Sequence, residues 1–287
     1  MSSVARPLGL GLAQITGEPY AAQANRARSV EAAGDLFRRG AQIVVLPEMI
    51  VPGYVADRDR LMELGESVDG PTVTAWREAA GEHGGWIAGG FCERVGDTLF
   101  NSAVVVGPDG VELHYRKLHP FREEKHVFAP GDLGLPVVEL PFGRVGLCVC
   151  YDLRFVEAVR VLALEGAELV CVPTAWLAGF DARQWDDDGM APQAAGAVLQ
   201  ANLDQVFIAC ASQVGRSDRY EFLGSSIVAG PRGDVLAGPL PIAAEELAVV
   251  EVDLEEVERA HVRDELITPR EDRRRDVYGL MVGGRLL

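Results

Sequence analysis

The chain has 287 residues, of which 48% are hydrophobic, and its formal net charge at pH 7 is −16. This length and apolar content are sufficient for one large α/β domain with a continuous core. The strong negative charge argues against nucleic acid or an anionic membrane as a partner.

Strand-like and helix-like segments alternate along the whole chain. In chain order, strands are expected at 8–14, 42–46, 86–90, 100–106, 111–115, 169–172, 206–212, 226–229, 235–237 and 247–252. Helices are expected at 21–39, 72–83, 152–165 and 190–202, and one begins at about residue 254. Pro108-Asp109-Gly110 and the sequence Pro231-Arg232-Gly233-Asp234 predict turns between paired strands.

One stretch of the chain is echoed by another. Residues 39–47 (RGAQIVVLP) and 165–173 (EGAELVCVP) share a glycine at a helix end, a short apolar strand and a proline that stops it. Two similar helix–strand units favour two related halves, and therefore two packed sheets with helices outside.

The N-terminus and the cysteines favour a cytoplasmic protein without a membrane span. The first residues, MSSVARPLGLGLAQITG, contain one Arg and an apolar run broken by glycines, which is the pattern of neither a signal peptide nor a membrane span. Five cysteines, an odd number, lie mostly in apolar segments. Reduced thiols fit this pattern better than a disulfide framework.

Cys150 is the first candidate for chemistry. The apolar run that begins at Val145 ends on this cysteine, and a helix-forming stretch follows without a linker. At such a corner the positive end of the helix dipole is expected to favour the thiolate. The alternative is that Cys150 is a small buried hydrophobic residue, which is the usual role of a free cysteine.

Three charged residues at other strand ends are further candidates. Glu48 follows a very apolar strand, where partial desolvation raises the pKa of a carboxyl group as a general base requires. Lys117 follows the second strand of a hairpin and is suited to stabilise a developing oxyanion. Glu124 lies in a charged loop. Each residue by itself also fits a solvated surface charge, so the argument rests on the set.

Three sequence blocks together resemble the signature of the nitrilase superfamily of carbon–nitrogen hydrolases. They are Leu46-Pro47-Glu48, then YRKLH at 115–119, then GLCVCYDLRFVE at 146–157. The resemblance continues through PTAW at 173–176, the helix at 193–202 and DRRRDVYG near the C-terminus. It implies a four-layer α-β-β-α sandwich that commonly pairs into a larger dimer and needs no metal or organic cofactor.

The resemblance assigns a role to each candidate. Glu48 corresponds to the general base, Lys117 to the oxyanion-stabilising lysine and Cys150 to the nucleophile. Glu124 corresponds to a second glutamate that positions the substrate, with Glu123 as the fallback. Alternation along a strand does not separate Cys148 from Cys150, but the following Tyr-Asp selects Cys150.

The resemblance also predicts the organisation and the substrate class. We expect a single domain over 1–287, with a C-terminal extension from about residue 254 at the interface of a homodimer or higher homo-oligomer. We expect hydrolysis of a small amide through a thioester, with release of ammonia. Arg154 is suited to receive a substrate carboxylate, which favours an ω-amide; its structural alternative is an ion pair with Glu157 or Asp152.

The pocket rim is expected to include Tyr54, Phe121, Tyr151, Trp176 and the loop at 179–189. An N-carbamoyl hydrolase is the main alternative activity, whereas a nitrilase or an acyltransferase is a weaker one. From other classes, a metal protein would have to use Cys148 and Cys150 with three nearby histidines, without a second Cys-x-x-Cys pattern. A non-catalytic scaffold would normally have lost one of the three central residues.

Overall fold

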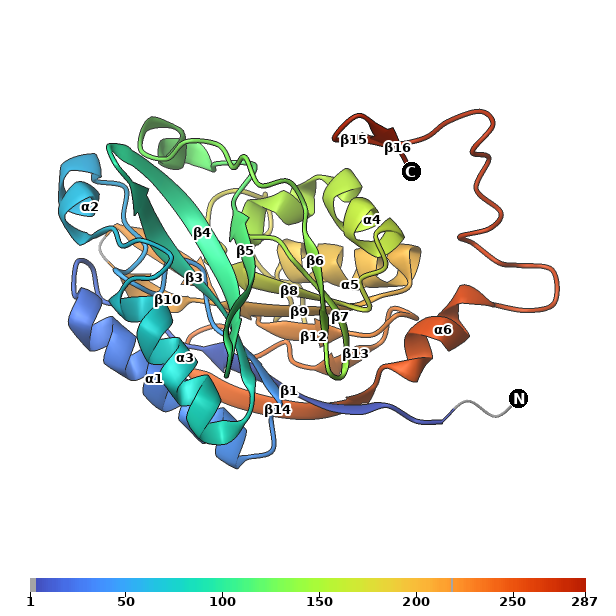
Figure 1. Ribbon diagram of the computed structural model, residues 1–287, viewed down its shortest axis with the longest axis horizontal. Helices are drawn as coiled ribbons and strands as arrows, with labels where there is room; N and C mark the ends of the chain where they lie inside the picture. Colours follow the sequence, from blue (N-terminus) through green and yellow to red (C-terminus); the bar gives the residue numbers. More distant parts are fainter. Residues whose placement is uncertain (1–3, 218) are drawn as a thin grey trace.

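Two six-stranded sheets lie face to face in the computed structural model, which describes residues 4–217 and 219–287 (Figure 1). The first three residues of the N-terminal segment considered above lie outside this description. In spatial order, the first sheet contains β14 (Glu246–Asp253), β1 (Pro7–Gln14), β2 (Ile43–Val45), β3 (Trp86–Val95), β4 (Thr98–Gly107) and β5 (Gly110–Arg116). The second contains β13 (Val235–Ala237), β12 (Ile227–Ala229), β9 (Phe207–Ser212), β8 (Leu169–Thr174), β7 (Gly143–Leu147) and β6 (Val137–Leu140).

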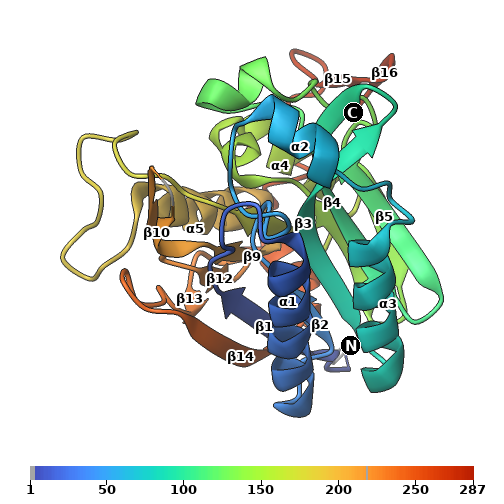
Figure 2. The same ribbon diagram turned by 90° about the vertical axis from the view of Figure 1, so that its left-hand side faces the viewer.

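Helices cover the outer face of each sheet, and this confirms the predicted four-layer α-β-β-α sandwich (Figure 2). Helices α1 (Ala22–Arg38) and α3 (Pro71–His83) pack on the first sheet, and α4 (Val156–Leu164) and α5 (Pro192–Asp204) pack on the second. The central strands β1, β2 and β3 run parallel, as do β7, β8 and β9. Parallel strands need helical crossovers, which place the helices on the outside.

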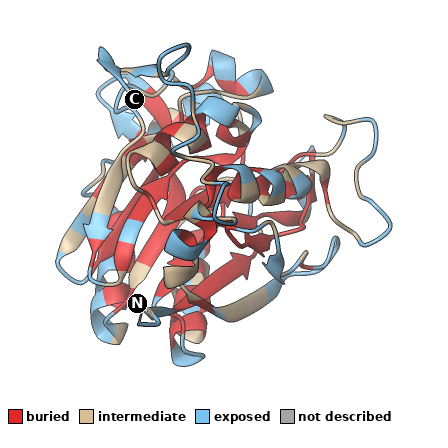
Figure 3. Cartoon of the chain, turned by 90° about the vertical axis from the view of Figure 1, so that its right-hand side faces the viewer, coloured by how far each residue is buried: buried red, intermediate tan, exposed pale blue. Residues whose placement is uncertain are grey.

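The residues of β2 show how the core is divided. Ile43 and Val45 lie between the two sheets, whereas Val44 and Leu46 pack against α1 and α3. All four are fully buried, because both faces of this sheet are covered, and a continuous apolar run is typical of such a strand. Figure 3 shows the same distribution, with the sheets buried and the outer helix faces exposed.

The two echoed segments occupy equivalent places in the two halves. The first contains β2 and the second contains β8, and each strand lies inside a six-stranded sheet between two parallel neighbours. The interpretation as two related halves therefore agrees with the sheet topology.

The expected helix at 152–165 is wrong in one respect, because it is divided. Residues Cys150–Arg154 form a 3-10 helix, η2, and α4 begins only at Val156. Phe155 between them is extended, with φ −103° and ψ 98°, and its ring stacks on His119 at 3.6 Å between centroids. A tertiary contact therefore overrides the local helical preference.

Several short elements were not expected from the sequence. They are α2 (Arg58–Leu64), the 3-10 helix η1 (Arg122–His126), β6, and the hairpins formed by β10 (Val214–Ser217) with β11 (Tyr220–Leu223) and by β15 (Met281–Val282) with β16 (Arg285–Leu286). Their short length leaves little periodic pattern to read.

The C-terminal segment continues beyond α6 (Glu255–His261) as an extended loop. Figure 1 shows that it loops away from the sandwich and returns near α4, where β15 and β16 pair. Arg270 anchors it by donating to the main-chain oxygen of Asp204 at 2.8 Å. None of the helices in the described ranges, 4–217 and 219–287, is both long and apolar enough to span a membrane.

Candidate active site

The ends of three strands bring the predicted residues to one end of the sandwich. Glu48 lies just beyond β2, Lys117 directly follows β5, and Cys150 lies three residues beyond the last residue of β7. The first two belong to one sheet and the third to the other, so the site lies between the sheets. All three side chains are at least nine-tenths buried.

The Lys117 ammonium group lies between two glutamates. Its Nζ is 2.6 Å from Glu48 Oε1 and 2.9 Å from Glu124 Oε2. The exposed fractions of Glu48, Lys117 and Glu124 are 0%, 1% and 3%. A buried lysine needs such compensation, because an unpaired charge is very costly in the interior.

A second layer of polar groups holds the two glutamates. Asn101 Nδ2 donates to Glu48 Oε1 at 2.7 Å, and the Tyr54 hydroxyl donates to Glu124 Oε1 at 2.7 Å. Gln213 Nε2 donates to the main-chain oxygen of Glu48 at 2.8 Å. We did not predict Asn101, although a polar amide within the apolar run of β4 is a usable signal.

Gly131 explains why a glycine follows the proline in the loop after Glu124. Its amide donates to the main-chain oxygen of Lys117 at 2.8 Å. A Cβ at this position would lie 1.9 Å from the carbonyl oxygen of Arg116. Only glycine allows this close approach, which fixes the backbone that carries Lys117.

Cys150 has an unusual backbone conformation. Its φ is +47°, a left-handed value that costs energy for a residue other than glycine and that occurs often at functional sites. Asp152 holds this corner, because its Oδ2 accepts from the amide of Val149 at 2.9 Å. The same oxygen accepts from the Tyr115 hydroxyl at 2.7 Å.

The expected effect of a helix dipole on Cys150 is not supported. The helical segment that begins at Cys150 has only five residues and is a 3-10 helix, too short for a strong dipole. Burial and the negative charge of Glu48 instead raise the pKa of the Cys150 thiol well above its ordinary value. Lys117 and the main-chain amide of Ala175 oppose this shift without outweighing it.

The pKa values of Glu48 and Lys117, like that of the neutral Cys150 thiol, are shifted by their surroundings. Burial, followed by the charge of Glu124, raises the pKa of Glu48 against the opposing effect of Lys117. Burial alone would lower the pKa of Lys117, but Glu124 and Glu48 outweigh it and hold this pKa well above its ordinary value. Glu48 Oε2 has no hydrogen-bond partner among the described residues, and the nearby Cys150 thiol slightly opposes the rise in the pKa of Glu48.

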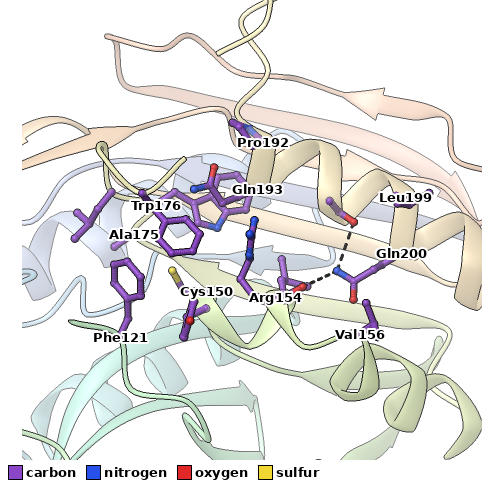
Figure 4. Close-up of a pocket in the computed structure, with 15 residues that line it drawn as sticks. Phe121, Cys150, Arg154, Val156, Ala175, Trp176, Pro192, Gln193, Leu199 and Gln200 are labelled. Atoms are coloured by element: carbon purple, nitrogen blue, oxygen red, sulfur yellow. Dashed lines mark hydrogen bonds between the residues drawn. The ribbon is translucent and has the colours of Figure 1, made fainter. Parts of the chain in front are cut away.

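A cavity of about 190 Å³ opens at Cys150. Figure 4 shows the sulfur pointing into it, close to Phe121. Three of the expected rim residues, Phe121, Tyr151 and Trp176, line this cavity, as does Arg154. Tyr54 does not: it is 5% exposed and lies behind Glu124, so its expected place at the rim is corrected.

The environment of Arg154 differs from both expected ion pairs. Its Nη1 lies 3.7 Å from Asp181 Oδ1, and its guanidinium carbon lies 4.8 Å from the centre of the Phe180 ring. The side chain is 44% exposed and lines the cavity. Neither Glu157 nor Asp152 pairs with it, because the side chain lies across the cavity toward the loop that carries Phe180 and Asp181.

Two of the histidines near the site have protein partners. His119 Nδ1 is 2.7 Å from Asp152 Oδ1, and His114 Nε2 is 2.9 Å from Glu93 Oε2. Within the described part of the chain, no group of three or more His, Cys, Asp and Glu residues is arranged to hold a metal ion.

Comparison with known proteins places this chain and its fold among hydrolases of carbon–nitrogen bonds. The carbon–nitrogen hydrolase family model matches residues 9–262. A protein from Pyrococcus abyssi named nitrilase is 37% identical over 84% of this chain and 87% of its own length. Human omega-amidase NIT2 is 31% identical over 84% of this chain and 86% of its own length. The structure of an amidase from Nesterenkonia sp. superposes with a TM-score of 0.77 at 25% identity and covers 95% of each chain.

The protein is therefore an enzyme of the class defined by an αββα sandwich and a C–N bond-cleaving site. Its chain belongs to the carbon–nitrogen hydrolase family, as the three sequence blocks predicted.

Proposed function

We propose that the protein hydrolyses a small carboxylate-bearing amide, of the ω-amide type, through a thioester on Cys150. One observation carries this proposal: Lys117 is fixed between Glu48 and Glu124 beside a cavity into which the Cys150 sulfur points. A titratable acid, a fixed cation and a thiol at one buried point are the parts that nucleophilic acyl transfer requires.

The roles follow from the electrostatics. Because the thiol is neutral at rest, its proton has to leave as the sulfur attacks the amide carbon, and Glu48 takes it. Lys117 and the main-chain amide of Tyr151 hold the negative charge that develops on the substrate oxygen. The C–N bond then breaks, Glu48 returns the proton to the leaving nitrogen, and ammonia departs.

The second half-reaction restores the enzyme. Glu48 takes a proton from water as the water oxygen attacks the thioester carbon. The C–S bond breaks, the acid product leaves, and the proton returns to the Cys150 sulfur. Glu124 keeps Lys117 in place throughout, since both of its carboxylate oxygens accept from the ammonium group.

A related enzyme supports the assignment of Cys150. In a variant of the amidase from Nesterenkonia sp. AN1, which has a TM-score of 0.78 at 25% identity, the acetamide moiety of fluoroacetamide is covalently added at the active site cysteine. The nucleophile of this chain is inferred to be Cys150, since it is the cysteine that lines the cavity.

The first test compares two neighbouring cysteines. Cys150→Ala should abolish ammonia release from an amide substrate, because no nucleophile remains. Cys148→Ala should largely preserve it, because Cys148 is fully buried and does not line the cavity. Steady-state kinetics on both variants, with circular dichroism to establish folding, make the comparison. Equal losses in two folded variants would overturn the assignment.

The second test concerns the carboxylate. Arg154 carries the positive charge of the cavity wall, so Arg154→Ala should raise KM for an acid amide by about 10-fold or more. A neutral amide of the same length should show a much smaller change. A screen of ω-amides, N-carbamoyl amino acids, simple amides and nitriles would separate the main proposal from the N-carbamoyl alternative. Equal effects on acidic and neutral amides would remove the carboxylate role.

We also propose that the protein works as a homo-oligomer. Large apolar side chains are exposed on two helices of the second sheet. Val156 on α4 is 59% exposed, and Leu199 and Leu203 on α5 are 59% and 47% exposed. Several large apolar side chains of the C-terminal segment are exposed as well, among them Tyr278 and Met281. A second copy that covers these side chains would remove apolar surface from water.

A further inference from the structure

One wall of the cavity carries buried polar groups that the proposed chemistry does not use. Trp176 is 2% exposed, and its buried indole Nε1 has no hydrogen-bond partner among the described residues. Within the same part of the chain Gln193 Oε1 is also buried without a partner, and both residues line the cavity. Figure 4 shows the Gln193 amide, the Trp176 indole and the Arg154 guanidinium gathered on one side of it, near Cys150.

Unpaired polar groups of this kind are rare in folded proteins. Most buried donors and acceptors have a partner, because a lost hydrogen bond is not replaced by water in the interior. Two such groups on one wall of a cavity of about 190 Å³ indicate that a ligand supplies the missing partners.

Asp181 adds a negative charge beside this wall: it follows Phe180, which lines the cavity, but does not itself line it. Its Oδ1 lies 3.7 Å from Arg154 Nη1, which is longer than a hydrogen bond. Its Oδ2 is buried and has no hydrogen-bond partner among the described residues. The ion pair is therefore loose, and Arg154 retains hydrogen-bonding capacity for a ligand.

The four side chains form a balanced set. Arg154 and Trp176 offer donors, and one of them is positively charged. Gln193 Oε1 offers an acceptor on the wall, and Asp181 adds a negative charge beside it. A carboxylate alone would pair with the donors, leave the Gln193 acceptor unpaired and bring a second negative charge close to Asp181.

We propose that this wall binds a dipolar head group, so that the substrate is the ω-amide of an α-amino acid. This inference rests on the proposed amidase function and specifies its substrate class. Arg154 and the Trp176 N–H receive the carboxylate, while the Gln193 carbonyl oxygen receives the adjacent ammonium group and Asp181, beside Arg154, supplies a compensating negative charge. The amide at the other end of the substrate then lies at the Cys150 sulfur.

Four amides with the same acyl chain test the head group. Glutamine carries both charges, glutaramate lacks the ammonium group, 4-aminobutanamide lacks the carboxylate, and butanamide lacks both. Ammonia release should give the highest kcat/KM for glutamine, with a loss of about 10-fold or more for each charge removed. A wild-type enzyme that prefers glutaramate to glutamine would overturn the proposal.

Two variants assign the two halves of the head group. Trp176→Phe keeps an aromatic ring but removes the N–H, so the ratio of kcat/KM for glutamine to that for 4-aminobutanamide should fall about 10-fold. Gln193→Leu should lower the ratio for glutamine to glutaramate by a similar factor. Unchanged ratios in both variants would contradict the assignment.

Trp86→Phe is the matched control. The indole Nε1 of Trp86 is also buried with no partner in the described ranges, but Trp86 does not line this cavity. Both ratios should therefore stay at their wild-type values. A change as large as that of Trp176→Phe would mean that the unpaired indole has only a structural effect.

Binding separates this proposal from the amidase function. The Cys150→Ala protein cannot form a thioester, so calorimetry can measure glutamine affinity without turnover. If the wild type releases no ammonia from any of the four amides, the amidase function fails. The head-group site is still supported if glutamine binds to Cys150→Ala and the added Trp176→Phe change raises the Kd for glutamine about 10-fold. The head-group proposal is wrong if glutamine does not bind.

Discussion

Asp152 connects two of the segments that carry the candidate active site. Its Oδ2 accepts from the amide of Val149 and the Tyr115 hydroxyl, and its Oδ1 accepts from the amide and ring of His119. It therefore joins the Cys150 corner to the loop that contains Lys117. We infer that Asp152 is a positioning residue, since it acts through the two neighbouring segments.

Replacement of Asp152 tests this role. Asn has one acceptor oxygen, so Asp152→Asn points an N–H group at donors and should lower kcat by about 10- to 100-fold. Tyr115→Phe removes only one of the four hydrogen bonds and should cause a smaller loss. The pH dependence of Cys150 alkylation should change in Asp152→Asn as well, a result that a loss of global stability alone would not produce. Wild-type kcat and alkylation rates in Asp152→Asn would refute the role.

Glu93 ties three neighbouring strands of the first sheet together near the site. It lies on β3, and it accepts from Ser102 on β4 at 2.6 Å and from Arg116 on β5 at 2.7 and 2.9 Å. Burial alone would raise the pKa of Glu93, but hydrogen bonds from Arg116, His114 and Ser102 lower it from 4.5 to about 2. Arg116 immediately precedes Lys117, so its ion pair with Glu93 stabilises the end of β5.

The Glu93 network should make the free energy of unfolding depend on pH. An unfolded Glu93 takes up its proton near pH 4.5, whereas the folded residue resists protonation until about pH 2. Its stabilisation is therefore complete above pH 4.5 and is lost as the pH falls toward 2. Glu93→Gln should cost about 3 kcal/mol at pH 7 because it breaks a buried ion pair.

Urea unfolding of both proteins at pH 7 and pH 3 provides the measurement. The difference between wild type and Glu93→Gln should shrink at pH 3. A difference that is the same at both pH values would show that Glu93 is not held ionised in this way.

The molecule as a whole combines a net charge of −16 with an apolar surface on one side. Helix α5 contributes Leu199 and Leu203 to this surface, although it also packs on the second sheet through Ala194, Ala197 and Ala201. Self-association has to overcome the like charge of two copies, so a mainly apolar contact is the physically reasonable interface.

A charge on this surface tests the proposed oligomer. Leu203→Asp should shift the protein toward the monomer, because burial of the new carboxylate in an apolar contact is costly. Sedimentation velocity over a range of concentrations measures the effect. Val95→Asp, at a position that is 50% exposed at the end of β3, is the control and should not change the oligomeric state. A monomeric wild type would contradict the proposal.

The sequence by itself was sufficient for the family, the four-layer fold and the candidate residues Glu48, Lys117 and Cys150. Apolar runs of the right length predicted the central strands, because strands that are buried on both faces carry a strong signal. Only the tertiary structure shows that the helix after Cys150 is divided, that Tyr54 lies behind Glu124 and that Arg154 pairs with Asp181. It also revealed Asn101 and the unpaired groups of Trp176 and Gln193. These features depend on contacts between residues far apart in the chain, and local sequence patterns do not predict such contacts.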